Sequence, residues 1–341
     1  MDNKKKRVLD AISHRQTDLV PWNFELTPGA VENIKRLAGC EDAFAYFENH
    51  MLRAKYKKNT RLENGNEKDL FGVTWMASKD GGDVGIIAEY PLEEDELGDY
   101  RFPEVDKEFA SGICDQLEAD HGEHFTMFSI TMGFFERSWS LRGMENIMID
   151  MCINESFTFQ LYDKILDHHL ELLDTVLDRD FDAVYFGDDW GQQRGSIMGP
   201  NMWRKYIKPG FKEMFEKVKS KGKKIVLHSC GDIEEFFPEL IHMGLDVYNT
   251  VQPEIYDLKK IKREYGKDLT FYGGISTQQF LPFASADEVK EKTREILDIM
   301  FRDGGYILSP THTATPDIPA ENLVAMIEAA KNYRERKRKW R

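Results

Sequence analysis

The chain has 341 residues, of which 41% are hydrophobic and 31% are charged, a balance that fits a globular protein and excludes a mostly disordered chain. Its 46 basic and 60 acidic residues leave a net charge of −14, which argues against nucleic acid or an anionic membrane as a partner. No apolar run approaches the roughly 18 residues of a membrane span, no signal peptide is recognisable, and the four scattered cysteines do not suggest a disulfide framework, so we expect a reduced, cytoplasmic protein.

The first third of the chain predicts a helix, a strand and an insertion. Residues 3–15 carry apolar side chains at helical spacing, and residues 19–24 form a short strand candidate. The stretch 50–105 differs, because turn signals such as Asn64-Gly65 and Asp80-Gly81-Gly82 separate short β-prone pieces. We interpret this stretch as a hairpin-like excursion inserted into the main fold.

From residue 125 onward, strand and helix patterns alternate regularly. The predicted strands span residues 125–130, 183–186, 224–227, 246–250, 269–272 and 306–308. The predicted helices span residues 154–179, 200–220, 233–243, 257–265, 285–302 and 320–335. The strands are short and apolar, as expected of parallel strands that are buried on both faces. This repetition over about 250 residues favours an eight-stranded (β/α)8 TIM barrel, with residues 1–341 as a single domain; an open, doubly wound sheet is the alternative.

Polar and aromatic residues follow the predicted strands at the points where the strands end. In a β/α barrel the loops after the carboxyl ends of the strands carry the chemistry, so these side chains should meet at one mouth. The candidates at the strand ends are Glu25, Asp188, Asp189, Trp190, Gln193, His228, Cys230, Asn249, Gln252 and His312, and Trp22 lies three residues before Glu25. No Gly-x-Gly-x-x-Gly or Walker-type loop follows any of these strands, so nucleotide binding has no support.

The sharpest local feature is the pair His228-x-Cys230. Thiolate and neutral imidazole are preferred ligands of zinc, and His312, after the last predicted strand, is placed to supply a third ligand across the barrel mouth. Three ligands would leave a fourth position open, as in catalytic zinc sites. The alternative is that Cys230 is a small buried hydrophobic residue without a metal.

The remaining candidates are assigned to catalysis or to substrate binding. Asp188 and Asp189 either cap the next helix or act in the site, and we favour the site. Glu25 is a third candidate acid. The residues expected to contact substrate are Trp22, Trp190, Gln193, Asn249 and Gln252. The two tryptophans are either barrel core or the walls of a slot for a flat ligand.

These residues make the chain recognisable, because it resembles the uroporphyrinogen decarboxylase superfamily of β/α barrels. The resemblance extends over nearly the whole length, from Arg7-Val8-Leu9-Asp10-Ala11-Ile12 to Pro319-Ala320-Glu321-Asn322, and includes His228-Ser229-Cys230-Gly231-Asp232. The true decarboxylases grip a polycarboxylate porphyrinogen with an arginine-containing loop after the first strand. Residues 23–29 contain no arginine here, so we expect no porphyrinogen decarboxylase activity.

The second branch of the superfamily comprises cobalamin-dependent methyltransferases with a His-x-Cys motif and a later cysteine. His228 and Cys230 match the first part, and His312 occupies the place of the later cysteine. Residues 188–192 are similar to a subgroup that looks like O-demethylases of methoxylated compounds. The resemblance therefore implies zinc, and a cobalamin carried by a separate corrinoid-binding protein that accepts the methyl group.

The resemblance also implies a mechanism. Zinc would polarise the ether oxygen of a methyl donor, cob(I)alamin would attack the methyl carbon, and Asp188, Asp189 or Glu25 would protonate the leaving oxygen. Two neutral imidazoles and one thiolate would give the zinc centre a charge of about +1, which suits a neutral ether. We expect a methoxylated aromatic donor, held between the two tryptophans, with nearby acids repelling anionic donors. The alternatives are a metal-free decarboxylase of a non-porphyrin substrate and a binding barrel without catalysis.

Overall fold

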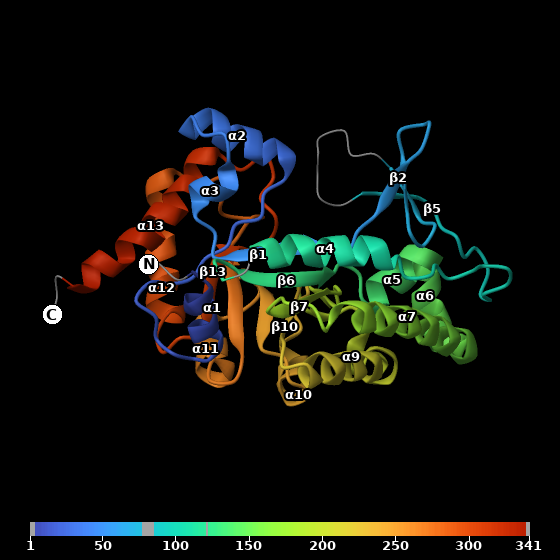
Figure 1. Cartoon of the computed structure of the whole chain (residues 1–341). Helices are drawn as coiled ribbons and strands as arrows, with labels where there is room; N and C mark the ends of the chain where they lie inside the picture. The colour runs from blue at the N-terminus through green and yellow to red at the C-terminus, as the bar shows by residue number, and fades with distance from the viewer. Residues whose placement is uncertain (1–3, 77–84, 121, 339–341) are drawn as a thin grey trace.

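Seven parallel strands form the central sheet in the computed structural model, which describes residues 4–76, 85–120 and 122–338 (Figure 1). In spatial order they are β1 (Met51–Lys55), β6 (Phe125–Ile130), β7 (Ala183–Gly187), β10 (Lys224–His228), β11 (Val247–Val251), β12 (Thr270–Ile275) and β13 (Tyr306–Pro310). Every neighbouring pair runs parallel. The six strands predicted after residue 125 are all present.

The predicted first strand closes this sheet into a barrel. Trp22 forms a parallel bridge with Leu308 of β13, and on its other side the Trp22 carbonyl accepts a hydrogen bond from the backbone of His50, just before β1. Pro21 has no N–H to donate, so this eighth segment pairs through a bridge rather than along a regular strand. The prediction of a TIM-barrel fold is confirmed.

One strand lies where the sequence suggested an insertion. Residues 51–55, at the start of the predicted excursion 50–105, are β1 and pair in register with β6. Arg53 and Lys55 interrupt the apolar run that typically marks a buried parallel strand, which is why the pattern did not reveal it.

The rest of the excursion is a small antiparallel sheet. Its strands are β2 (Asn59–Arg61), β3 (Glu67–Asp69), β4 (Thr74–Trp75) and β5 (Ile87–Glu89). Gly65 takes a left-handed φ of 87° in the turn between β2 and β3, as the Asn64-Gly65 signal predicts. The Asp80-Gly81-Gly82 signal lies outside the described residues. A further short hairpin, β8 (Gly191–Gln192) and β9 (Gly195–Ser196), follows β7.

Helices surround the barrel and close one of its ends (Figure 1). They are α1 (Lys4–Ile12), α2 (Pro28–Ala38), α3 (Ala43–Phe47), α4 (Lys107–Ala119), α5 (Phe134–Arg142), α6 (Met144–Ile153), α7 (Glu155–Val176), α8 (Gly199–Met202), α9 (Lys208–Ser220), α10 (Phe237–Met243), α11 (Leu258–Tyr265), α12 (Ala286–Met300) and α13 (Ala320–Arg338). A π-helical turn, Trp203–Ile207, joins α8 to α9, and a 3₁₀ turn, Glu234–Phe236, precedes α10.

The helix α1 packs against the amino-terminal ends of the barrel strands. Its Val8 and Ile12 join a buried cluster with strand residues such as Met51, Phe125 and Val247, each of which begins its strand. This leaves the carboxyl ends of the strands as the open mouth. Among the described residues, no helix is both long and apolar enough to cross a membrane. The four cysteines, all of them described, form no disulfide.

Candidate metal centre and its cavity

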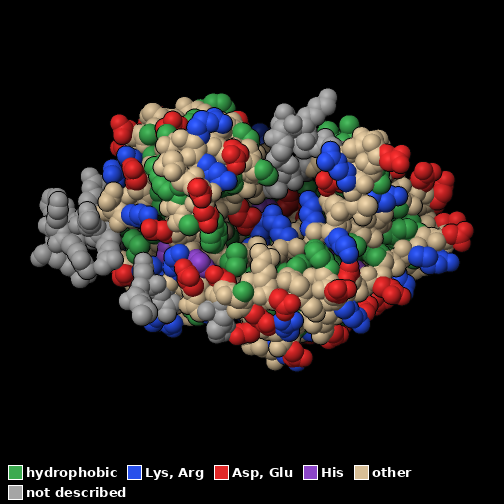
Figure 2. Space-filling model, turned by 45° about the horizontal axis from the view of Figure 1, so that its top comes forward, with side chains coloured by type: hydrophobic (Ala, Val, Ile, Leu, Met, Phe, Trp, Pro, Cys, Tyr) green, Lys and Arg blue, Asp and Glu red, His purple; other side chains and the backbone are tan. Residues whose placement is uncertain are grey.

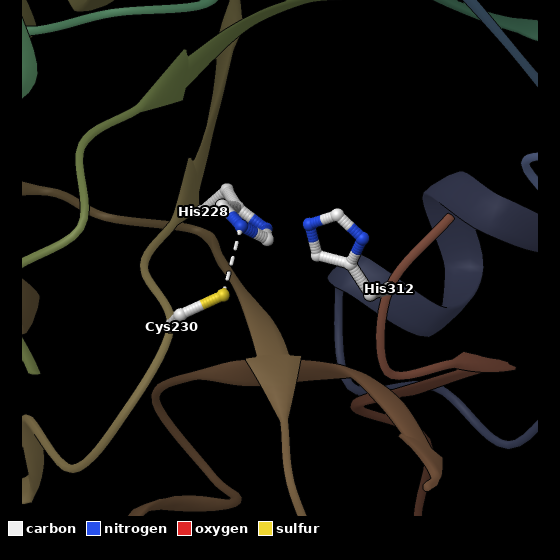
Figure 3. Close-up of side chains that lie close together, drawn as sticks. All are labelled: His228, Cys230 and His312. Carbon is white, nitrogen blue, oxygen red and sulfur yellow. Dashed lines mark hydrogen bonds between the residues drawn. The ribbon is translucent and has the colours of Figure 1, made fainter. Parts of the chain in front are cut away.

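Three candidate ligands converge at the mouth of the barrel. The ligand atoms of His228, Cys230 and His312 all lie within 4.8 Å of one another (Figure 3). Cys230 Sγ is 3.5 Å from His228 Nε2, and the two imidazole rings are 5.9 Å apart between centroids. His228 ends β10, while His312 follows β13 from across the mouth. The predicted juxtaposition is therefore present in the fold.

The orientation of His228 is determined by Asn249 on the next strand. The two residues are paired in the β10–β11 register, and His228 Nδ1 lies 2.6 Å from Asn249 Oδ1. The hydroxyl of Tyr185 also donates to Oδ1, while the amide group of Asn249 donates to the carbonyl of Tyr272. Since Oδ1 can only accept, Nδ1 carries the proton and Nε2 presents its lone pair toward Cys230.

The charge state of His228 also suits it to bind a metal ion. Burial lowers its pKa below the ordinary value of histidine, so the ring is neutral near pH 7, the state in which it binds metals. Burial, and after it the carboxylate of Asp189, raises the pKa of the Cys230 thiol. The sulfur therefore carries a proton until a cation displaces it.

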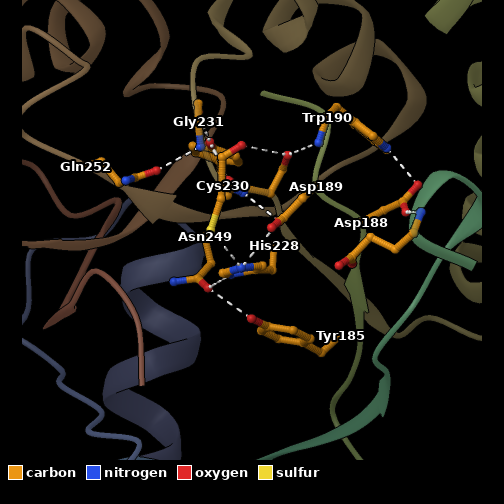
Figure 4. A network of polar contacts seen from close by, with 12 residues as sticks. Tyr185, Asp188, Asp189, Trp190, His228, Cys230, Gly231, Asn249 and Gln252 are labelled. Atoms are coloured by element: carbon orange, nitrogen blue, oxygen red, sulfur yellow. Dashed lines mark hydrogen bonds and ion pairs between the residues drawn. The ribbon is translucent and has the colours of Figure 1, made fainter. Parts of the chain in front are cut away.

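Two loops meet at this point and hold Cys230 in place (Figure 4). Asp189 Oδ1 accepts a hydrogen bond of 2.8 Å from the backbone N–H of Cys230 and lies 3.6 Å from His228 Nε2. Gly191 and Gly231 allow this approach, because a Cβ added at Gly231 would lie only 2.1 Å from the Gly191 carbonyl carbon. Gly231 also has a left-handed φ of 79°.

The donor set fits zinc. For tetrahedral zinc with Zn–S of about 2.3 Å and Zn–N of about 2.0 Å, the sulfur and nitrogen should be roughly 3.5 Å apart. The separation of Cys230 Sγ and His228 Nε2 is 3.5 Å. Two imidazoles and one thiol are ligands that favour zinc over magnesium or calcium. The Nδ1 hydrogen bond of His228 supplies the outer contact that zinc-bound histidines ordinarily make.

A cavity of about 710 Å³ opens onto this centre. His228, His312, Asp189 and Asn249 line it. One wall is basic and comes from β1 and the chain that follows it: Arg53, Lys55, Lys57, Lys58 and Arg61. Figure 2 shows Lys and Arg side chains gathered in the central hollow of this face. A chain with a net charge of −14 thus has a basic wall at its cavity.

A comparison with protein families assigns the chain. The model of the family Uroporphyrinogen decarboxylase (URO-D) matches residues 70–333, which is most of this chain. The chain belongs to the URO-D family. A comparison with curated proteins found no match.

Several solved structures are similar to this URO-D family member. A methyltransferase from Methanosarcina mazei is 17% identical, with 97% of this chain and 99% of that chain covered and a TM-score of 0.75. An endo-β-1,4-xylanase from Gloeophyllum trabeum is 9% identical over 71% and 84% of the two chains, with a TM-score of 0.41. A D-psicose 3-epimerase from Clostridium cellulolyticum H10 is 10% identical over 69% and 84%, with a TM-score of 0.40. The first of these likenesses shows the fold over nearly the entire URO-D chain.

The tryptophans predicted to hold a flat ligand do not line the cavity of this URO-D protein. Trp22 is 2% exposed, and its indole N–H donates to the carbonyl of Phe47. Trp190 is completely buried against aromatic core residues. The prediction of a slot between them is wrong, because both side chains point into packed core. Trp75 and Trp139 line the cavity instead.

Asp188, predicted to act in catalysis, is not among the cavity-lining residues and supports α5 instead. Its carboxyl is fully buried and accepts hydrogen bonds from the backbone N–H groups of Phe134, Phe135 and Glu136, at the start of α5, and from the Trp190 indole. It therefore caps α5. Burial raises its pKa to about 7. Asp189, one residue on, faces the cavity.

Two predicted substrate contacts are also placed elsewhere. Gln252 is buried, and its Oε1 accepts from the backbone N–H of Gly231 at 2.8 Å, so it stabilises the loop that carries Cys230. Gln193 is exposed between β8 and β9 and is not among the cavity-lining residues. Asn249 does line the cavity, where it orients His228.

Glu25 lies in the cavity as predicted, but as half of an ion pair. Arg53 of β1 bonds to its carboxylate, and Lys55 lies 3.7 Å from the same oxygen. The guanidinium of Arg53 also stacks on the Tyr185 ring, 4.2 Å from its centroid. Residues 23–29 contain no arginine, but Arg53 of β1 places one beside Glu25. The lining of this URO-D cavity contains basic as well as acidic residues, whereas the sequence suggested only acids as the charged groups at the mouth.

Glu136 is the main cavity residue that the sequence analysis missed. It lies in the first turn of α5, after a strand end that carries no other acid, and lines the cavity beside Arg137. The only available signal was its position six residues after the predicted strand 125–130.

Proposed function

We propose that this protein is a zinc-dependent methyltransferase that moves a methyl group from a methoxylated donor to the cob(I)alamin of a separate corrinoid protein. The observation that carries this proposal is the convergence of His228, Cys230 and His312 at a cavity. Membership of the URO-D family supports it, since the His-x-Cys motif resembles that of the corrinoid methyltransferases in this superfamily. A protein of the same fold is described as a methyltransferase.

The residues divide the work between holding a metal and positioning its ligands. His228, Cys230 and His312 would hold zinc, which when bound supplies a Lewis acid to the ether oxygen of the donor. Asn249 keeps the proton of His228 on Nδ1. Asp189 fixes the backbone of Cys230.

The proposed transfer is a nucleophilic displacement at the methyl carbon. The bond between the methyl carbon and the donor oxygen breaks, with its electron pair left on oxygen. The electron pair of Co(I) on the partner protein forms the new carbon–cobalt bond. The oxygen then needs one proton, and Asp188 cannot be its source, because its carboxyl is buried and accepts four hydrogen bonds from the protein.

The walls of the cavity bear on the identity of the donor. Trp75, Trp139 and Phe71 offer aromatic surface, which supports a methoxylated aromatic compound. The basic wall changes the expected charge, because Lys57 and Arg61 would attract a donor with a carboxylate rather than repel it. We therefore favour a methoxylated aromatic acid over a neutral methoxyphenol.

The same basic wall favours one alternative. A metal-free decarboxylase of a non-porphyrin substrate would also need cations to bind a carboxylate, and this URO-D family member has them at Lys57 and Arg61. The two functions differ in metal dependence. Release of CO₂ from a carboxylic acid by metal-free protein, without methyl transfer, would establish the alternative.

The test is a methyl-transfer assay. Purified protein is incubated with a reduced corrinoid protein and separate methyl donors, and methylcobalamin is followed by its absorbance. Methoxylated aromatic acids should donate, and Cys230→Ala protein should not support transfer. If methanol, trimethylamine or a thiol donates while all methoxyaromatics are inert, the proposed donor class is wrong. If no donor reacts in the presence of zinc, the proposed function itself is wrong.

A further inference from the structure

Glu136 lies at the cavity on a rigid support. The three backbone N–H groups that begin α5, including that of Glu136 at 2.7 Å, donate to the carboxyl of Asp188 at the end of β7. The first turn of α5 is thereby attached to the strand that also carries Asp189. Glu136 lines the same cavity as His228 and His312.

The surroundings of the Glu136 carboxyl favour its neutral form. Asp189 and Asp188, just after β7, place negative charge beside it, although the backbone N–H of Asp189 also donates a hydrogen bond to the Glu136 carboxyl. The adjacent cation, Arg137, is engaged elsewhere: it pairs with Asp69 at 2.8 Å and stacks on the Phe71 ring. Burial, followed by the carboxylates of Asp189 and Asp188, raises the pKa of Glu136 well above the ordinary value.

The other acids near the centre are occupied. Both oxygens of Asp188 accept hydrogen bonds from α5, and Glu25 is paired with Arg53. Asp189 accepts the backbone N–H of Cys230. Glu136 lines the same cavity as His228 and His312, and its raised pKa lets the carboxyl keep a proton, so it is suited to release one there.

We propose that Glu136 is the catalytic acid that protonates the oxygen released when the methyl group leaves. This role rests on the proposed function. The carbon–oxygen bond breaks with its electron pair on oxygen, the O–H bond of Glu136 breaks, and the products are the demethylated alcohol or phenol and the Glu136 carboxylate. A proton from solvent, entering through the cavity, restores the acid. The negative charge of Asp189 then favours reprotonation.

The first test needs no turnover. Infrared spectra of zinc-loaded protein near pH 7 should contain the carbonyl band of a protonated carboxyl, and ¹³C-labelled glutamate should shift it, which separates Glu136 from Asp188. Glu136→Gln should remove the band, whereas Glu145→Gln, in the exposed first turn of α6, should leave it. A zinc-loaded protein without this band overturns the proposal.

The second test varies the leaving group. With methoxyarenes whose phenols range from weakly to strongly acidic, Glu136→Gln should lose about 10²-fold in turnover with the least acidic phenols and little with the most acidic ones. Zinc content and melting temperature should match those of Glu145→Gln. An equal loss for all donors would assign Glu136 a structural role and overturn the proposal, as would no loss. If wild-type protein transfers no methyl group, the proposed function has failed, and the infrared band still decides whether Glu136 holds a proton.

Discussion

The Nδ1 atom of His228 lies 2.6 Å from the Oδ1 atom of Asn249, its register partner on the adjacent strand. This contact fixes the tautomer of a candidate metal ligand by means of a neutral amide. Tyr185 and the Tyr272 carbonyl in turn fix the amide, so the imidazole cannot rotate without breaking several hydrogen bonds. The orientation of this candidate metal ligand therefore depends on residues that would not touch a bound metal.

Asn249→Leu should weaken zinc binding about 10- to 100-fold, because His228 loses the contact that directs Nε2 toward Cys230. Titration with a competing zinc chelator measures this change. Asn322→Leu is the matched control, since Asn322 is also buried but bonds to the Leu281 and Ala284 carbonyls. That variant should be less stable but keep its zinc affinity. Equal zinc affinity in wild type and Asn249→Leu would contradict the positioning role.

Cys230→Ala and His312→Ala should each abolish stoichiometric zinc binding while the barrel stays folded, because two ligands do not hold zinc firmly. Elemental analysis of purified protein gives the zinc content, and circular dichroism reports the fold. Cys152→Ala, which alters an exposed thiol on α6, should retain one zinc per chain. Full zinc retention by Cys230→Ala would refute the assignment of the ligands.

The neighbours Asp188 and Asp189 should respond oppositely to the same substitution. Asp188→Asn places an amide N–H against the donors of α5 and should lower stability by about 1–3 kcal/mol, measured by urea unfolding. Asp189→Asn retains the oxygen that accepts from Cys230 and should leave stability nearly unchanged.

The Asp189→Asn substitution, which should leave stability nearly unchanged, should nevertheless reduce turnover. Removal of its charge beside His228 and Glu136 should reduce methyl transfer about 10²-fold, the scale of a lost group in acid–base catalysis. Steady-state kinetics of Asp189→Asn measure this. Unaltered turnover would show that Asp189 only supports the loop.

Lys57→Gln and Arg61→Gln should each raise the KM for a methoxylated aromatic acid about 2- to 5-fold without changing kcat, as expected for exposed charges at the cavity rim. The effect should diminish at high salt and be absent for a neutral methoxyarene. Lys68→Gln, on β3 but outside the cavity lining, should have no effect. A uniform rise in KM for charged and neutral donors would argue against recognition of a carboxylate.

His169, buried in α7, should make the fold sensitive to acid. Burial lowers its pKa to about 3, whereas an unfolded chain has a histidine pKa of about 6.5. The folded state binds this proton less readily than the unfolded chain does. The contribution of neutral His169 to the free energy of unfolding is therefore fully present above about pH 6.5 and is lost as the pH falls toward 3. Urea unfolding should show a loss of about 1.4 kcal/mol per pH unit from this residue. His169→Leu should remove that part of the slope, and His242→Gln, on the surface, should not; an unchanged slope in His169→Leu would contradict this account.

The periodicity and motif spacing of the sequence were sufficient to predict the barrel and the grouping of the candidate metal ligands. The alternation of short apolar strands with helices predicts parallel strands, and parallel strands bring their carboxyl ends to one edge. A residue just after such a strand must lie at that edge, whatever the details of packing. This is why the sequence could place His228 and Cys230 beside His312, although Cys230 and His312 are 82 residues apart. The three side chains lie together in the fold.

Which side chains face the cavity depends on contacts that form only in the folded chain. Asp188 and Asp189 are adjacent in the chain, yet successive residues of an extended segment point to opposite sides, so one caps α5 and the other reaches the site. The basic wall and Glu136 come from β1 and α5, whose position depends on contacts between segments distant in sequence. Periodicity predicts where a strand ends, but the path of the loop and the packing of its neighbours determine where each side chain points.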